Sequence, residues 1–165
     1  MKIKPAVIDH VQTQHSSFIV DLDLENNITF FTGDAGTGKS TVFDIIREMA
    51  AENKAIRCLN YLDLKKNYKN TIRRSKGKLF FIDNADILLD DDMRWYIATD
   101  GKNQYILFGR NPTGLMLSQD EIMELNSERR DGKTMFTLFF TFILLLKGSV
   151  FGIITAGMGT FDRWL

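Results

Sequence analysis

Short apolar runs alternate along the chain with stretches of helical periodicity. The apolar runs expected to form strands lie at Ile28–Phe31, Ala55–Asn60, Leu79–Asp83 and Tyr105–Gly109. Between them, Lys39–Met49 carries apolar residues at helical spacing, and Asp86–Thr99 is also expected to be helical. Strands that are apolar throughout and alternate with helices are typical of a parallel sheet covered on both faces. The pattern therefore predicts an α/β fold.

Two further strands are expected at the N-terminus, Val7–Val11 and Phe18–Leu24, joined by a polar turn over Gln12–Ser17. In the second of them every other residue is apolar, which is the period of a half-buried antiparallel strand. The sequence thus predicts an antiparallel strand pair before the parallel strands.

The composition changes at Thr134, after which apolar residues dominate. Met135–Phe142 is favoured as the last core strand of the same sheet because it follows an α/β pattern. This interpretation divides the chain into one domain over residues 1–142 and an apolar tail over residues 143–165.

A membrane segment is the competing interpretation of this C-terminal region. The run Thr134–Leu146 is shorter than the roughly twenty residues that a helix needs to span a bilayer. The stretch as far as Phe161 is long enough if Lys147 is tolerated near an edge. A truncated end and membrane contact through the tail both stay open.

Composition narrows the classes of function. With 165 residues, of which 44% are hydrophobic, the chain is large enough to bury one core. Its 21 basic residues balance 21 acidic ones, so the net charge gives no reason to expect binding to nucleic acid. The single cysteine, Cys58, fits a buried thiol in a reducing compartment, and no secretory signal is visible near Met1. We therefore expect a cytoplasmic protein.

The most specific pattern is Gly33–Ser40, which fits G-x-x-x-x-G-K-[ST] between an expected strand and an expected helix. Glycines allow the backbone N–H groups to turn inward around phosphate oxygens. Lys39 can then reach the β- and γ-phosphates, and the hydroxyl of Ser40 can bind Mg²⁺. The helix that begins here directs its positive end at the anion. The pattern predicts a nucleoside triphosphate site.

A second element is Asp83, at the end of an apolar strand, where a carboxylate can hold Mg²⁺ through water. Together, Gly33–Ser40 and Leu79–Asp83 resemble the Walker A and Walker B motifs of P-loop NTPases, and the resemblance covers about Asn26–Asn111. Within that superfamily the chain looks most like the ATPase division that includes AAA+ and ABC-type proteins. The resemblance implies a three-layer fold with a mainly parallel sheet, and ATP with Mg²⁺ as ligands.

The resemblance also implies roles for individual residues. Residues expected to contact the nucleotide are Gly33, Asp34, Ala35, Gly36, Thr37, Gly38, Lys39, Ser40 and Thr41. Ser40 and Asp83 would hold the metal ion. Residues expected to take part in catalysis are Lys39, Asp83, Asn84, Asp86, Arg110 and Asn111. Arg110 or Asn111 matches a polar sensor after the next strand, although Pro112 also explains these residues as an ordinary turn.

One departure from the family matters. Many such ATPases have a glutamate directly after the Walker B aspartate, whereas this chain has Asn84. An amide can position water but cannot take its proton, so Asp86 is the nearest replacement base. Asp86 also fits the start of the next helix.

The expected function is Mg²⁺-dependent ATP hydrolysis that controls association with an unidentified protein partner. The alternatives are an ATP-dependent switch or scaffold without turnover, favoured by Asn84, and a small-molecule kinase, for which only Arg129 and Arg130 hint at a lid. An oligomer stays open. The basic stretch Tyr61–Lys78 is weak support for nucleic acid and better explained as a solvated face.

Overall fold

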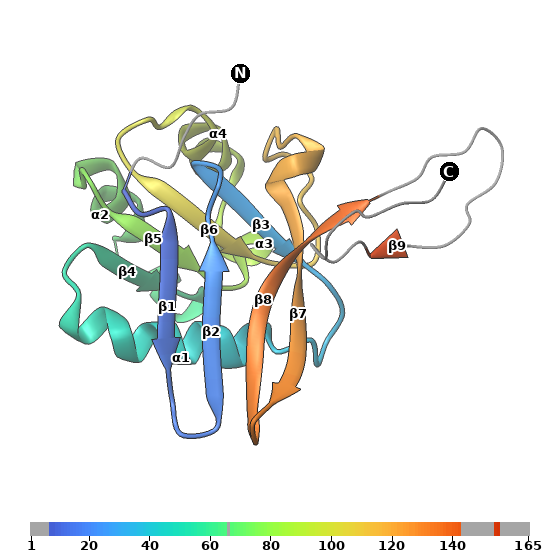
Figure 1. Ribbon diagram of the computed structural model, residues 1–165. Helices are drawn as coiled ribbons and strands as arrows, with labels where there is room; N and C mark the ends of the chain where they lie inside the picture. The colour runs from blue at the N-terminus through green and yellow to red at the C-terminus, as the bar shows by residue number, and fades with distance from the viewer. Residues whose placement is uncertain (1–6, 66, 143–153, 156–165) are drawn as a thin grey trace, which may run out of the picture.

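The computed structural model describes residues 7–65, 67–142 and 154–155 (Figure 1). Eight strands form one sheet in the order β1-β2-β8-β7-β3-β6-β5-β4, and β9 pairs with β8 off this path. The strands are β1 His10–Gln14, β2 Phe18–Asp23, β3 Ile28–Thr32, β4 Ile56–Leu59, β5 Leu79–Ile82, β6 Gln104–Phe108, β7 Ile122–Arg130, β8 Lys133–Phe142 and β9 Ile154–Thr155. The helices are α1 Lys39–Glu52, α2 Tyr68–Arg74, α3 Ala85–Leu88 and α4 Asp91–Thr99, with 3-10 helices η1 Tyr61–Lys65 and η2 Gln119–Glu121.

The expectation of a three-layer α/β fold around a mainly parallel sheet is wrong. The structure is a mixed, strongly curled half-barrel sheet with few helices, and 31% of the described residues are helical (Figure 1). Antiparallel pairing joins β1 to β2 and β7 to β8. The strands β3, β6, β5 and β4 do pair parallel to their neighbours, but they form only one side of the curled sheet.

The error arises from a long β-hairpin that the apolar pattern did not reveal. β7 and β8 pair antiparallel as far as Arg130 and Lys133, and the connecting residues Asp131 and Gly132 have φ values of 50° and 79°. Positive φ at both central residues defines a two-residue type I′ turn, for which Asp-Gly is a preferred sequence. The last four residues of β7 are exposed, so the strand has no continuous apolar run. Through β8 the hairpin pairs with β2 and extends the sheet.

The N-terminal antiparallel pair is present, but its first strand begins later than the predicted Val7–Val11. The backbone N–H groups of Val7 and Ile8 donate to Oε1 of Gln104 at 3.3 and 2.9 Å instead of joining the strand ladder. At its other end β1 extends to Gln14, so the turn is shorter than the predicted Gln12–Ser17.

The core lies on both faces of the central strand β3. Phe31 packs in a buried cluster with Val42 of α1, whereas Phe30 packs in a second cluster with Ile72 of α2 and Met93 of α4. Phe30 and Phe31 are completely buried. Because both faces of β3 are covered, the loop that follows this strand starts from a rigid support.

The predicted helix Asp86–Thr99 divides into α3 and α4. Leu89 and Asp90 between them have extended backbones, and the carboxylate of Asp90 accepts the N–H of Met93 at 3.1 Å. This is the ordinary role of an aspartate before a helix. The run of aspartates therefore starts a helix.

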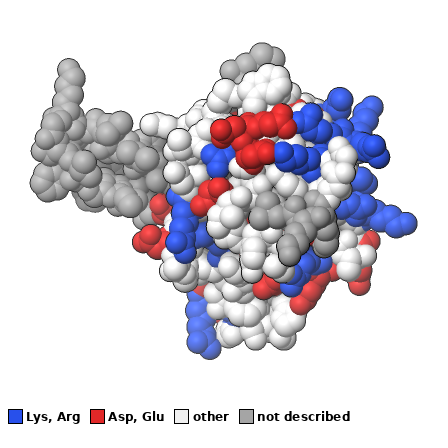
Figure 2. Space-filling model, turned by 180° about the vertical axis from the view of Figure 1, so that it is seen from behind, with Lys and Arg blue, Asp and Glu red and all other residues white. Residues whose placement is uncertain are grey.

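The basic stretch contains η1 and α2 and is partly neutralised. Arg73 forms an ion pair with Asp92 at 2.7 Å, and Lys69 forms one with Asp90. Figure 2 shows acidic and basic side chains next to one another on the face seen from behind. Lys69 and Arg73 therefore have a structural role, as partners in ion pairs.

The strand predicted over Met135–Phe142 is confirmed as β8, although Phe136 alone among its described side chains is fully buried. Apart from β9, the apolar tail and most of the alternative membrane segment lie outside the described residues. Within the described part of the chain, no helix is both long enough and apolar enough to cross a membrane.

Candidate functional site

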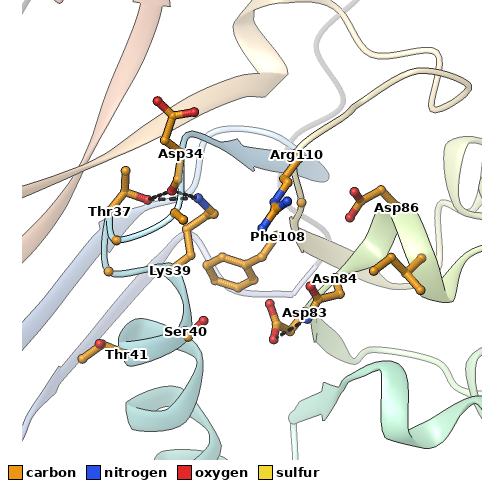
Figure 3. A pocket seen from close by; sticks show the side chains of 15 residues that line it. Asp34, Thr37, Lys39, Ser40, Thr41, Asp83, Asn84, Asp86, Phe108 and Arg110 are labelled. Atoms are coloured by element: carbon orange, nitrogen blue, oxygen red, sulfur yellow. Dashed lines mark hydrogen bonds between the residues drawn. The ribbon is translucent and has the colours of Figure 1, made fainter.

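A cleft of about 470 Å³ lies where the parallel strands β3, β5 and β6 end (Figure 3). The loop after β3 forms one wall, residues 83–87 after β5 form another, and Phe108–Arg110 at the end of β6 form the third. Ligands commonly bind beyond the carboxyl ends of neighbouring parallel strands. The volume lies within the range of ligand pockets, roughly 300–1,000 Å³.

The loop Gly33–Gly38 has the curled backbone that its glycines predicted. Gly33, Gly36 and Gly38 have φ values of 128°, 88° and 92°, and Gly38 directly precedes α1. The first N–H groups of a helix have no partner within it, and they give its start a partial positive charge. In the described helix α1 the first turn carries no acidic side chain, so no carboxylate of its own offsets that charge.

Lys39 lies across the mouth of this loop. Its Nζ donates to the carbonyl oxygens of Gly33 and Asp34 at 2.5 and 2.8 Å and to Oγ1 of Thr37 at 3.0 Å (Figure 3). Burial lowers the pKa of Lys39, and the nearby positive charge of Arg110 lowers it further. A cationic group with this environment gains from a neighbouring anion.

Asp83 lies on the opposite side of the cleft in an acidic environment. Burial raises the pKa of its carboxyl group, and the charges of Asp44 and Asp86 add to the rise. Asn84, which has a φ of 51°, donates from Nδ2 to Oδ2 of Asp83 at 2.9 Å. Asn84 thus orients the Asp83 carboxylate.

Ser40 and Asp83 face each other across the lower part of the cleft (Figure 3). Among the described residues, no group of three or more His, Cys, Asp or Glu side chains is arranged to hold a metal. A hydroxyl and one carboxylate suffice for Mg²⁺ bound to a nucleotide, because that ion keeps several waters and phosphate oxygens as ligands. The two side chains therefore fit an Mg²⁺–nucleotide complex.

The remaining predicted site residues divide into two groups. Asp86 and Arg110 line the cleft with the loop, whereas Asn111 does not. The Oδ1 of Asn111 instead accepts the backbone N–H of Thr113 at 2.9 Å, which supports the turn interpretation for this residue. Thr41 lines the cleft, but its side chain points away from the centre in Figure 3. Arg129 and Arg130 are exposed at the end of β7 and do not line the cleft.

Several residues near the cleft were missed by sequence reasoning. Phe108 and Ile87 line it, and Glu124 of β7 lines a neighbouring cavity. Because Phe108 and Ile87 are apolar, their side chains did not indicate a role in binding or catalysis. Glu124 could be found only after recognising β7, because strand pairing places it beside Thr32, the residue before the loop.

Arg94 of α4 joins two walls of the cleft. Its Nη2 donates to the carbonyl oxygen of Asp86, its Nη1 to that of Thr113 and its Nε to that of Leu89, each at 2.9 Å. The guanidinium group thus connects α3 to the segment that follows Arg110. This one rigid, planar group donates a hydrogen bond to each of three carbonyl oxygens.

We expect Arg94→Met to lower the free energy of unfolding by roughly 2–3 kcal/mol, because charge-assisted hydrogen bonds are lost and their acceptors are left unpaired. Urea denaturation measures the change. The matched control is Arg74→Met at an exposed position of α2, which should change stability by no more than about 0.5 kcal/mol. Equal losses in the two variants would contradict the proposed connection.

Comparisons with protein-family models, with curated proteins and with solved structures find no match, so a proposal about function rests on the residues of the cleft.

Proposed function

We propose that the cleft binds ATP as its Mg²⁺ complex. The observation that carries the proposal is that one cleft is lined by two cationic side chains, Lys39 and Arg110, and by the carboxylates of Asp83 and Asp86. The two cations gain from a polyphosphate, and the carboxylates gain from a divalent cation. Mg²⁺-ATP supplies both charges in one ligand.

Each residue has a defined role in this proposal. Lys39 exchanges its bonds to the loop carbonyl oxygens for charge-assisted bonds to phosphate, and the N–H groups at the start of α1 donate to further phosphate oxygens. Ser40 and Asp83 hold the metal ion. Arg110, which lines the same cleft from β6, stabilises negative charge on the terminal phosphate.

We propose that ATP hydrolysis controls association with a protein partner. Binding without turnover is the second candidate, because the amide of Asn84 is bound to Asp83 and cannot accept a proton from water. Isothermal calorimetry tests binding, and phosphate release in the presence of Mg²⁺ separates the two candidates.

Asp83→Asn tests the metal role. We expect the variant to bind ATP in EDTA as the wild type does, but to lose most of the gain in affinity that Mg²⁺ provides, because a neutral amide is a poorer ligand for a hard cation. Calorimetry with and without Mg²⁺ measures this difference. Asp91→Asn, an exposed control in α4, should retain the full Mg²⁺ effect. If Asp83→Asn retains it too, Asp83 does not hold the metal.

A further inference from the structure

Glu124 is placed beside the phosphate loop by the pairing of β7 with β3. Its backbone is in register with Thr32, and its half-buried side chain lines a cavity of about 520 Å³. The same cavity is lined by Gly33 and Arg110. Among the described residues, none forms a hydrogen bond or ion pair with the Glu124 side chain. A carboxylate without such a contact is available for chemistry.

The cavity adjoins the cleft around the first half of the loop. Asp34, Ala35, Thr37 and Arg110 line both spaces. The charge of Glu124 also acts on Lys39, where it offsets part of the fall in the pKa of that amine. Glu124 and the groups proposed to hold the terminal phosphate therefore belong to one continuous region.

Two other acidic residues of the cleft, Asp83 and Asp86, are less suited to take a proton. Asp83 is bound by Asn84 and is proposed to hold Mg²⁺. A carboxylate oxygen of Asp86 packs against Gly109, where an added Cβ would lie only 2.9 Å from it. Arg94 also holds the backbone of Asp86. Glu124 lacks such constraints. It lies on β7, which pairs with β3 on the side opposite to β6.

Building on the proposed function, we propose that Glu124 is the general base that accepts the proton of the hydroxyl group attacking the γ-phosphate, and that its cavity admits this hydroxyl compound. The hydroxyl oxygen forms a bond to the γ-phosphorus while the bond to the β–γ bridging oxygen breaks. The bridging oxygen leaves with the electron pair as part of ADP, and the hydroxyl proton passes to Glu124. Water gives inorganic phosphate, and an alcohol gives a phosphate ester.

Glu124→Gln tests the assignment while preserving the shape of the side chain. We expect kcat for phosphoryl transfer to fall by about 10²- to 10⁴-fold, the usual contribution of a general base. The Kd for Mg²⁺-ATP from calorimetry should change less than about threefold, because the base acts in the transition state. Phosphate release in buffer identifies water as acceptor, and formation of glycerol phosphate with added glycerol identifies an alcohol.

The matched control is Glu128→Gln, on the same strand but exposed and paired with Arg130 at 3.8 Å, which should retain the wild-type rate. The inference is overturned if Glu124→Gln keeps its rate while Asp86→Asn loses it. It is also overturned if the wild type binds ATP yet forms neither product. Absence of ATP binding to the wild type would overturn the proposed function itself.

Discussion

Lys39→Ala is expected to weaken ATP binding by at least about 100-fold, because hydrogen bonds to charged groups contribute roughly 1.5–3 kcal/mol each and more than one is lost. Lys39 is the residue whose Nζ closes the loop through Gly33, Asp34 and Thr37. Its replacement removes both the cation and this support. Calorimetry with Mg²⁺-ATP measures the loss.

The fold should survive this substitution, because among the described residues the hydrogen bonds of the Lys39 amine are confined to the loop and none involves the buried clusters on either face of β3. Circular dichroism and the thermal midpoint check this point. Lys54→Ala provides a control with the same change in charge, since Lys54 is exposed just beyond the other end of α1. ATP affinity should be unchanged in that control. Unchanged affinity in Lys39→Ala would refute the proposed nucleotide site.

Much of the local structure of the site could be predicted from the sequence. A buried strand, a glycine-rich turn and a helix are each determined by nearby residues, so β3, the loop and α1 lie where the pattern placed them. The same holds for Asp83, because the apolar run before it forms β5. The chemistry of these residues stays a prediction.

The sheet as a whole could not be predicted, because its shape depends on pairing between distant segments. The Asp131-Gly132 turn was the local signal for the β7–β8 hairpin, but β7 is too polar at its end to stand out as a strand. Parallel pairing of β2 with β8 has no signature in either strand alone. Glu124 was missed for the same reason, since its position beside Thr32 follows from the parallel pairing of β7 with β3.

Gly38 connects the phosphate loop to this unexpected hairpin. A Cβ added at Gly38 would lie 2.4 Å from Cε1 of Phe136 on β8, well inside contact distance. Phe136 is buried and stacks on Phe18 of β2, with ring centroids 5.9 Å apart. The ring has little room to move because it is packed from the other side. Glycine is therefore favoured at this position by the contact with Phe136 as well as by the φ of 92°.

Gly38→Ala is expected to lower the free energy of unfolding by roughly 2–5 kcal/mol, combining about 1–2 kcal/mol for the left-handed backbone with about 1–3 kcal/mol for overpacking. Gly36→Ala is the matched control. Gly36 has a similar φ of 88°, but a Cβ there would meet no described atom within 4 Å, so only the backbone cost should appear. Urea denaturation of both variants measures the difference.

A double-mutant cycle with Phe136→Leu identifies the source of that difference. If the ring of Phe136 causes the clash, the smaller side chain should recover about 1 kcal/mol or more of the loss in Gly38→Ala, because contacting residues show coupling energies of roughly 0.5–3 kcal/mol. Equal destabilisation in Gly36→Ala and Gly38→Ala, together with additive effects in the cycle, would show that the hairpin does not support the loop. Coupling would instead show that β8 positions the start of α1, and with it the proposed phosphate site.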